Sequence, residues 1–174
     1  LTAVKAIQKI GTDDAIIPLL LCHILSTGSI IKGEILETIA RFQNMKESLD
    51  NISFLAVIEN LTKNKKEQLQ KKIIANISKS IIRPKKIRYI SALKYFKNEA
   101  ALKALRDLLD TKYINITQAA RGSLKYIFQN MDYNQFSETC ILNLFFQILH
   151  QIFHIIHLDI QIEELLKKIT WRNV

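Results

Sequence analysis

The sequence has little of what β structure and frequent turns require. It contains only 4 Gly and 2 Pro among 174 residues, whereas an all-β protein needs many Gly- and Pro-rich turns. Val is also rare, with 3 residues against 29 Ile. The scarcity of turn residues argues for helices. Because Ile has a modest intrinsic helix propensity, burial must stabilise these helices more than propensity does.

Cysteine is scarce as well. Cys22 and Cys140 both lie within apolar helical runs, and the pattern of a small disulfide-rich secreted domain is absent. We therefore expect two small buried hydrophobic residues and no disulfide. No signal peptide is visible, and we expect a cytoplasmic protein. The sequence begins at Leu1 in the middle of a helical pattern, so we expect a fragment of a longer chain.

Apolar residues recur with the helical period along almost the whole chain. Thr12 is a suitable N-cap, and Pro18 predicts a delayed or kinked start for the helix that follows. Pro84 predicts a break, because the residue before a proline is disfavoured in helical geometry. Short connections make sequential helices antiparallel. About ten helices are expected, at 4–10, 12–27, 30–42, 47–61, 65–82, 85–97, 99–110, 117–129, 136–157 and 160–169.

The sequence also contains an internal repeat. With a shift of 86 residues, 4–19 aligns with 90–105, so that Ile16 meets Leu102 and Leu19 meets Leu105. The match resumes where 42–44 lies over 128–130, again with a shift of 86 residues. A shift of 86 residues corresponds to two periods of about 43 residues.

Residues 98–130 resemble a HEAT repeat of the short bacterial kind. The matching positions are the start Asn98-Glu99-Ala100, then Leu105, the turn Leu108-Leu109-Asp110, and Ala119-Ala120-Arg121. The resemblance covers about residues 1–130. It implies an all-α fold, a right-handed α-solenoid (ARM/HEAT-like superhelix) of about ten helices in antiparallel pairs. A TPR array is the main rival, and the period near 43 residues and the lack of the TPR Trp and Pro positions count against it.

In such an array, helix pairs stack on one another and share a continuous core. We therefore expect a single HEAT-like domain over 1–174, with repeat units at 12–44, 46–82 and 98–130. Residues 1–10 would be the second helix of a truncated unit. Residues 136–174 would form capping helices at the C-terminal end.

The positive charge is concentrated in one segment. The net charge is +9, yet 63–97 holds 12 basic residues and one acid, Glu67, and the other 139 residues hold 13 basic and 15 acidic residues. Lys65, Lys72 and Lys79 recur every seven residues and share one helical face, opposite an apolar face of Leu69, Ile73, Ile77 and Ile81. The expected partner-binding residues are Lys65, Lys72, Lys79, Arg83, Lys86 and Arg88.

The leading hypothesis is a non-catalytic scaffold that binds a protein partner with an acidic surface. The resemblance implies that the second helix of each pair (30–42, 65–82 and 117–129) lines the groove. One alternative is a nucleic-acid-binding helical repeat, for which Tyr89 and Tyr95 are the aromatic residues available for stacking. The positive charge could also have no binding role and be a solvated lysine face that reflects a lysine-rich composition.

No motif predicts an active site. Gly-rich phosphate loops, metal-binding Cys/His spacings and nucleophile elbows are absent from the sequence. The adjacent pairs Asp13-Asp14 and Glu163-Glu164 fit helix starts better than catalysis. We expect no catalytic residue, metal or cofactor. Short HEAT-like repeats also occur in phycobilin lyase subunits, so the resemblance leaves an enzyme subunit or accessory domain as a second alternative.

The C-terminal segment carries a histidine row. His150, His154 and His157 share one helical face, where two His residues four apart can chelate a metal. No carboxylate or thiol accompanies them, and they continue a neutral polar stripe of Asn143, Gln147 and Gln151. The surrounding run 140–158 has the length of a bilayer span, but this stripe is costly in lipid. We expect an apolar helix over 136–157 that packs within the fold or on another chain, without crossing a membrane.

Overall fold

In the computed structural model, the chain divides into two compact units, Leu1–Met131 and Asp132–Val174. The structure describes residue 7 and residues 13–45 and 52–130, all within the first unit. This part of the chain contains helices and no β-strand, so the all-α prediction is confirmed for it. Cys140, the histidine row, the run 140–158 and the helices expected beyond 131 lie outside the described residues.

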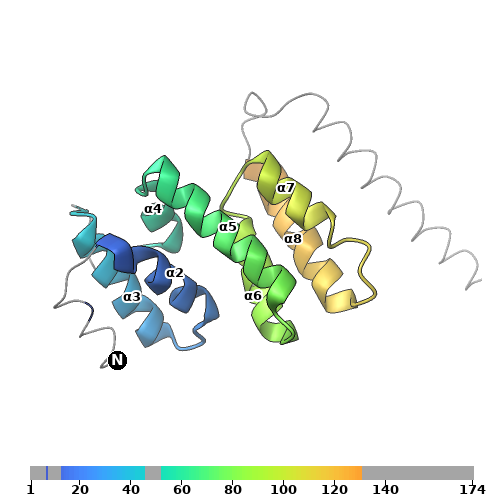
Figure 1. The fold of residues 1–174 in the computed structure, drawn as a ribbon, viewed down its shortest axis with the longest axis horizontal. Coiled ribbons are helices and arrows are strands. Elements are labelled where there is room, and N and C mark those ends of the chain that lie inside the picture. The colour runs from blue at the N-terminus through green and yellow to red at the C-terminus, as the bar shows by residue number, and fades with distance from the viewer. Residues whose placement is uncertain (1–6, 8–12, 46–51, 131–174) are drawn as a thin grey trace, which may run out of the picture. The chain divides into compact units, whose positions relative to one another are not determined.

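Seven α-helices follow one another in the described ranges, and each corresponds to one of the predicted helices. They are α2 (Ile16–Leu25), α3 (Ser29–Phe42), α4 (Phe54–Glu59), α5 (Lys63–Lys79), α6 (Arg83–Leu93), α7 (Glu99–Arg106) and α8 (Ile114–Asn130), with a 3-10 turn, η1 (Asp13–Ala15), before α2 (Figure 1). None of those seven is long and apolar enough to cross a membrane.

Capping residues and prolines account for several helix ends. Asn98 caps α7, where its Oδ1 accepts a hydrogen bond from the amide of Ala101 at 3.0 Å. Pro84 lies in the first turn of α6, where the N–H that proline lacks would have no helical partner anyway. Pro18 is the third residue of α2, which begins at Ile16, later than a cap at Thr12 would allow. The later start of the helix at Pro18 is confirmed. The predicted break before Pro84 is also present, at 80–82, but Arg83 directly before the proline already belongs to α6, so the reason given for the break is wrong.

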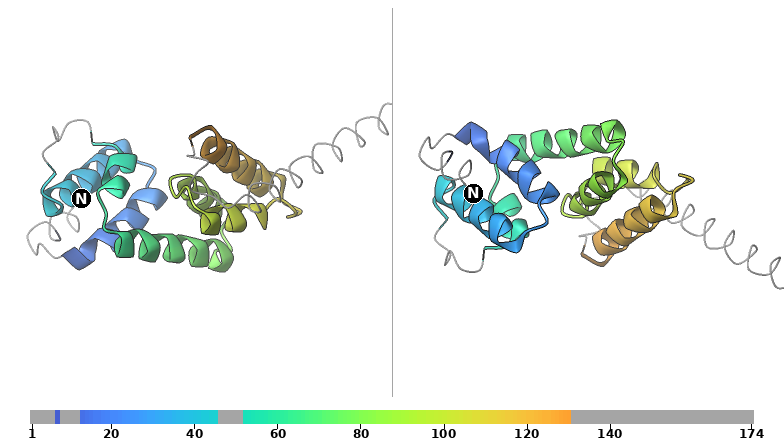
Figure 2. Two further views of the ribbon diagram at one scale, coloured as in Figure 1. Left: turned by 90° about the horizontal axis from the view of Figure 1, so that it is seen from above. Right: turned by 90° about the horizontal axis from the view of Figure 1, so that it is seen from below.

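The helices pack as three successive hairpins, α2 with α3, α5 with α6, and α7 with α8 (Figures 1 and 2). Helix α6 is central, because it also packs against α2, α7 and α8. The expected unit 46–82 would pair α4 with α5, yet α4 packs on α3, and α5 packs mainly on α6 and α2. A physical reason is that α4 has only 6 residues and buries only Val57 and Ile58, too little apolar surface to hold a long helix.

The internal repeat agrees with the pattern of burial. Ile16 and Leu19 of α2 are buried, as are Leu102 and Leu105 of α7, 86 positions later. In the second helices the register slips by one residue. Buried Ile35, Thr38 and Ile39 of α3 correspond to buried Ala120, Ser123 and Leu124 of α8 with a shift of 85. The first and third hairpins therefore have equivalent core faces.

Polar side chains connect the second and third hairpins. Gln70 of α5 is buried and exchanges two hydrogen bonds with Asn98, at 2.7 and 2.9 Å. Ser123 of α8 is also buried and donates to the carbonyl of Ile90 in α6 at 3.1 Å. A buried polar group costs free energy unless it is hydrogen-bonded, so both contacts favour one register between hairpins.

Two predictions about individual residues are wrong. Cys22 is exposed, because Leu20 and Ile24, two positions to either side, turn to the core and leave Cys22 on the outer side of α2. Ile81 is 96% exposed, because α5 ends at Lys79 and the apolar face does not continue beyond it. Asp13 and Asp14 lie in η1 directly before α2, as expected for residues at a helix start.

Candidate functional site

Aromatic side chains from α2, α4, α8 and the segment just after α6 form a row across the hairpins. The rings of His23 (α2) and Phe54 (α4) stack with centroids 4.7 Å apart and planes 7° from parallel. Tyr95, just after α6, meets Phe54 edge-on at 5.3 Å and Tyr126 of α8 edge-on at 6.0 Å. Both arrangements are favourable for aromatic pairs. The row ties α2, α4, α6 and α8 together through side chains.

An open cleft lies beside this row, with a volume of about 220 Å³. Its walls come from α2, the start of α3, the start of α4, and α6 with the two residues that follow it. Three cationic side chains, Lys32, Arg88 and Lys94, contribute to the lining, and none of the described lining residues is acidic. We call this site the cationic cleft, and its lining is His23, Ile24, Lys32, Phe54, Ile87, Arg88, Ser91, Ala92, Lys94 and Tyr95.

Two of the three cations contact uncharged groups. Arg88 donates to the backbone carbonyl of Leu25 at the end of α2. The Nζ of Lys94 lies 5.0 Å from the ring centroid of Tyr95 and 4.9 Å from that of Tyr126. Among the described residues, none of the three forms an ion pair with a carboxylate. Their positive charges are therefore uncompensated locally and favour an anion in the cleft.

His23 forms a neutral part of the cleft wall. Burial, and secondly the positive charge of Lys32, lower the pKa of His23 to about 4. At neutral pH the imidazole is therefore uncharged. Its Nδ1 is buried and has no hydrogen-bond partner within the part of the chain that the structure describes. The ring stacks on Phe54. The positive charge of the cleft therefore comes from its Lys and Arg side chains.

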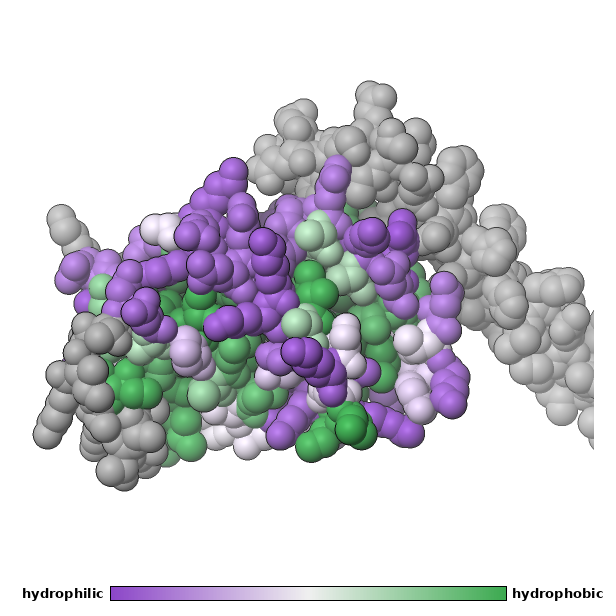
Figure 3. Space-filling model, in the orientation of Figure 1, coloured by the Kyte–Doolittle hydropathy of each residue, from purple (hydrophilic) through white to green (hydrophobic). Residues whose placement is uncertain are grey.

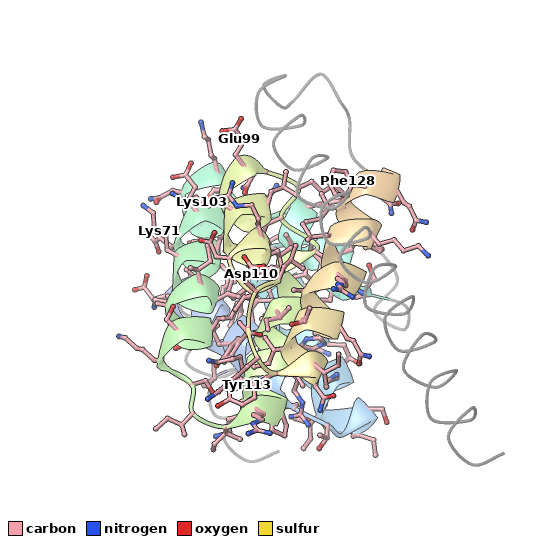
Figure 4. The ribbon with its side chains drawn as sticks, turned by 90° about the vertical axis from the view of Figure 1, so that its right-hand side faces the viewer. Lys71, Glu99, Lys103, Asp110, Tyr113 and Phe128 are labelled. Carbon is pink, nitrogen blue, oxygen red and sulfur yellow. The ribbon has the colours of Figure 1, made fainter. Side chains whose placement is uncertain are left out.

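The predicted basic residues separate into different surroundings. Lys65 forms an ion pair with Asp13, whereas Lys72 and Lys79 are exposed on α5, where the neighbouring Lys71 also projects outward (Figure 4). Figure 3 shows the hydrophilic surface that covers the upper part of α5. Arg83 lies over the ring of Tyr113 at 4.3 Å, and Lys86 is half-buried. Of the six, only Arg88 lines the cleft.

Sequence reasoning did not identify most of the cleft. Lys94 lies in the basic segment 63–97, but Lys32 is the only basic residue between Lys9 and Arg41 and carries no local signal. His23 falls in the apolar stripe of α2, which gives a weak hint that it is not a surface residue. Phe54 reaches the site because α4 packs on α3, a contact that no periodicity in the sequence predicts.

The arrangement suits binding more than chemistry. A carboxylate or phosphate oxygen entering the cleft would find donors on Lys32, Arg88 and Lys94, with apolar and aromatic walls beside them. In the described ranges, no group of three or more His, Cys, Asp or Glu residues gathers to hold a metal ion. The cleft thus has the elements of an anion-binding site.

No protein-family model, curated protein or solved structure matches this chain.

Proposed function

We propose that this chain is a non-catalytic interaction module that binds an acidic protein segment in the cationic cleft. One observation carries the proposal: Lys32, Arg88 and Lys94 line one cleft, and no acidic side chain is among its described lining residues. Three like charges brought together by folding repel one another. A bound carboxylate would offset that repulsion by its attraction to the cations and would accept charge-assisted hydrogen bonds.

The shape of the cleft favours a side chain or short segment over a large globular surface. An open volume of about 220 Å³ is smaller than typical small-molecule pockets of about 300–1,000 Å³. Its apolar and aromatic walls would cover the aliphatic part of an entering Glu or Asp side chain. The other carboxylates of an acidic segment would then meet Lys86 or the exposed lysines of α5.

The three hairpins would belong to a longer α-solenoid of the HEAT-like kind, right-handed and built from about ten helices. The equivalent core faces of the first and third hairpins support this proposal. A stack of repeats keeps each hairpin in contact with its neighbours and leaves a continuous surface for an extended partner. We propose a cytoplasmic scaffold of this type.

A pair of matched double variants tests the binding site. Lys32→Met with Lys94→Met removes two charges from the cleft, and Lys72→Met with Lys79→Met removes two from α5, so the net charge changes equally. Binding of a fluorescent poly-glutamate peptide is measured by anisotropy at low and physiological salt. We expect the cleft variant to bind at least about tenfold more weakly than the α5 variant. Equal losses, or a larger loss in the α5 variant, would overturn the proposed site.

A second candidate function is binding of single-stranded nucleic acid. The observation that favours it is the aromatic row of His23, Phe54, Tyr95 and Tyr126 beside the cleft cations, since such proteins combine stacking rings with a positive groove. Titration of the parent chain with an oligothymidine distinguishes the candidates, because both place the ligand in the same cleft and differ in which ligand binds more tightly. The scaffold proposal expects the peptide to bind more tightly than an oligonucleotide of equal charge, and the reverse order would favour nucleic acid.

A further inference from the structure

The large hydrophobic residues that are exposed in the described ranges gather at one type of location. The most exposed are Ile81 (96%), Ile30 (72%) and Ile114 (65%), and the others are Ile31, Ile82 and Tyr113. Each lies in, or within three residues of, a turn that joins the two helices of a hairpin. We call this set of six residues the turn edge. Exposed apolar residues scattered singly need no explanation, but a grouping of this kind marks an interaction surface.

Contacts between the hairpins bring these turns to the same edge. Arg83, at the start of α6, lies 4.3 Å over the ring of Tyr113, which connects the α5–α6 turn with the α7–α8 turn. Arg88, further along α6, donates to the carbonyl of Leu25 next to the α2–α3 turn. In Figure 1 the three turns lie on the lower side of the hairpins, and in Figure 4 Tyr113 lies at that same end.

The side chains around the turn edge are basic. The three segments 28–32, 80–86 and 111–114 contain Lys32, Arg83, Lys85, Lys86 and Lys112 and no Asp or Glu. The nearest acids along the chain, Glu34 and Asp110, lie just outside these segments. Figure 3 shows a hydrophobic cluster at the lower edge, where the α5–α6 turn lies in Figure 1, with hydrophilic atoms beside it. Exposed isoleucines with a basic surround therefore recur along one edge.

The location of these residues argues for a flat, fluid partner. Further hairpins or a second copy that extended the array would pack on the faces of the hairpins and leave the turns uncovered. The isoleucines lie at the ends of hairpins. From there their side chains can insert a short distance into the apolar layer of a membrane. Lys and Arg side chains beside them can reach back to anionic headgroups while their aliphatic stems stay in contact with the apolar layer.

We propose that the turn edge docks on the surface of a bilayer that contains anionic phospholipids. Ile30, Ile81, Ile82 and Ile114 enter the boundary between headgroups and acyl chains, and the five basic side chains bind headgroup phosphates and carboxylates. This is a contact with the membrane surface and not a span. It is independent of the cationic cleft, except that Lys32 lies between the two surfaces.

The test is flotation of the full chain with vesicles of equal parts phosphatidylcholine and phosphatidylserine, compared with vesicles of phosphatidylcholine alone. We expect binding to the anionic vesicles only. Ile81→Ser with Ile82→Ser should weaken that binding by at least about tenfold, because two exposed apolar anchors are lost. Both residues are exposed, so the helical circular dichroism should not change. Failure to bind the anionic vesicles, or binding that the double variant leaves unchanged, overturns the proposal.

Matched charge variants separate a specific edge from net charge. Arg83→Gln, Lys85→Gln and Lys86→Gln remove three charges from the turn edge, and Lys71→Gln, Lys72→Gln and Lys79→Gln remove three from α5. We expect weaker vesicle binding only in the first. Equal losses would reduce the effect to overall charge and overturn the proposal. Self-association of the parent chain that the isoleucine variant abolishes would also overturn it, because a second copy would then be the partner. Poly-glutamate binding should be unchanged in the isoleucine variant. Failure of the membrane proposal can therefore be distinguished from failure of the proposed binding site in the cleft.

Discussion

At the scale of single residues, the surroundings of His23 lower its pKa enough to be measured by titration. Burial and the charge of Lys32 hold the pKa of His23 at about 4, below the usual 6.5. Above pH 6.5 the imidazole is neutral in both the folded and the unfolded chain. Between pH 6.5 and pH 4 the unfolded chain binds the proton first, so this group lowers the free energy of unfolding as the pH falls through that window.

An NMR pH titration of the His23 ring protons checks this directly. We expect a midpoint near pH 4 in the parent chain and a small upward shift in Lys32→Met, because burial is the larger cause and persists. A midpoint near 6.5 in the parent chain would contradict the stacked, buried ring. His23→Phe should remove the corresponding part of the pH dependence of stability, while the stack on Phe54 is kept.

The amide pair of Gln70 and Asn98 should be worth more than an ordinary helix cap. Asn98→Ala removes the cap of α7 and leaves the buried amide of Gln70 without its two hydrogen bonds. Loss of a cap costs about 1 kcal/mol, and a buried unpaired polar group costs about 1–3 kcal/mol. We expect urea denaturation to give a loss of about 2–4 kcal/mol for Asn98→Ala.

Ser53→Ala is the matched control for that variant. Ser53 caps α4 by accepting from Ala56 at 3.0 Å, is exposed, and has no partner from another hairpin among the described residues. Its loss should cost about 1 kcal/mol. If the two variants lose the same stability, the pair between α5 and α7 contributes nothing beyond capping.

Several residues show where local patterns stop being informative. Leu69, Ile73 and Ile77 are buried as their spacing predicts, but Ile81 is exposed because the helix ends first. Lys65 has the same heptad spacing as Lys72 and Lys79, yet it alone pairs with Asp13. The helical period determines on which side of a helix a residue lies. Which residue it contacts depends on which other helix packs against that side.

At the scale of helices, α6 is the element on which the described fold depends most. It packs on α2, α5, α7 and α8, and its Ile90 and Leu93 are fully buried. We expect Ile90→Ala to lower the free energy of unfolding by about 2–5 kcal/mol. Ile81→Ala makes the same change at an exposed position and should alter stability by less than about 0.5 kcal/mol.

Hydrogen exchange on the Ile90→Ala variant gives the corresponding pattern along the chain. Because α6 joins the hairpins, amides of both α2 and α8 should exchange faster, although neither is altered. Faster exchange confined to α6 would show that the hairpins are stable independently of it.

The sequence predicted the helices well and their pairing less well. Apolar period and the prolines give all seven described helices because these signals are local. The errors at their ends are small except for α4, which begins at Phe54 where a start at 47 was expected. The pairing of α5 with α6 is not local. It follows from the small core that α4 offers and from the buried contacts that α6 makes on several sides, and neither quantity can be read from a period of about 43 residues.

At the scale of the whole molecule, the division into units makes a prediction about folding. Leu1–Met131 and Asp132–Val174 are separate compact units. A fragment of residues 1–131 should therefore fold with the helical content and unfolding midpoint that this part has in the full chain. Circular dichroism during urea denaturation measures both. A fragment that is unfolded at zero denaturant would show that the first unit depends on the second.

The candidate site also belongs to this scale. Lys32, Arg88 and Lys94 are separated by up to 62 positions in the sequence, and the packing of α3 on α2 and of α2 on α6 brings their helices together. The sequence correctly locates the excess of positive charge at 63–97. It does not predict which two of those residues join Lys32, because that depends on contacts between hairpins.

The most direct test of the cationic cleft is an NMR titration of the isotope-labelled chain with an unlabelled poly-glutamate peptide, followed through backbone amide shifts. We expect the largest shifts to fall on residues that line the cleft, among them Lys32, Ser91 and Tyr95, and added salt to reverse them. Shifts confined to Lys72, Lys79 and their neighbours on α5, with the cleft amides unmoved, would contradict binding in the cleft.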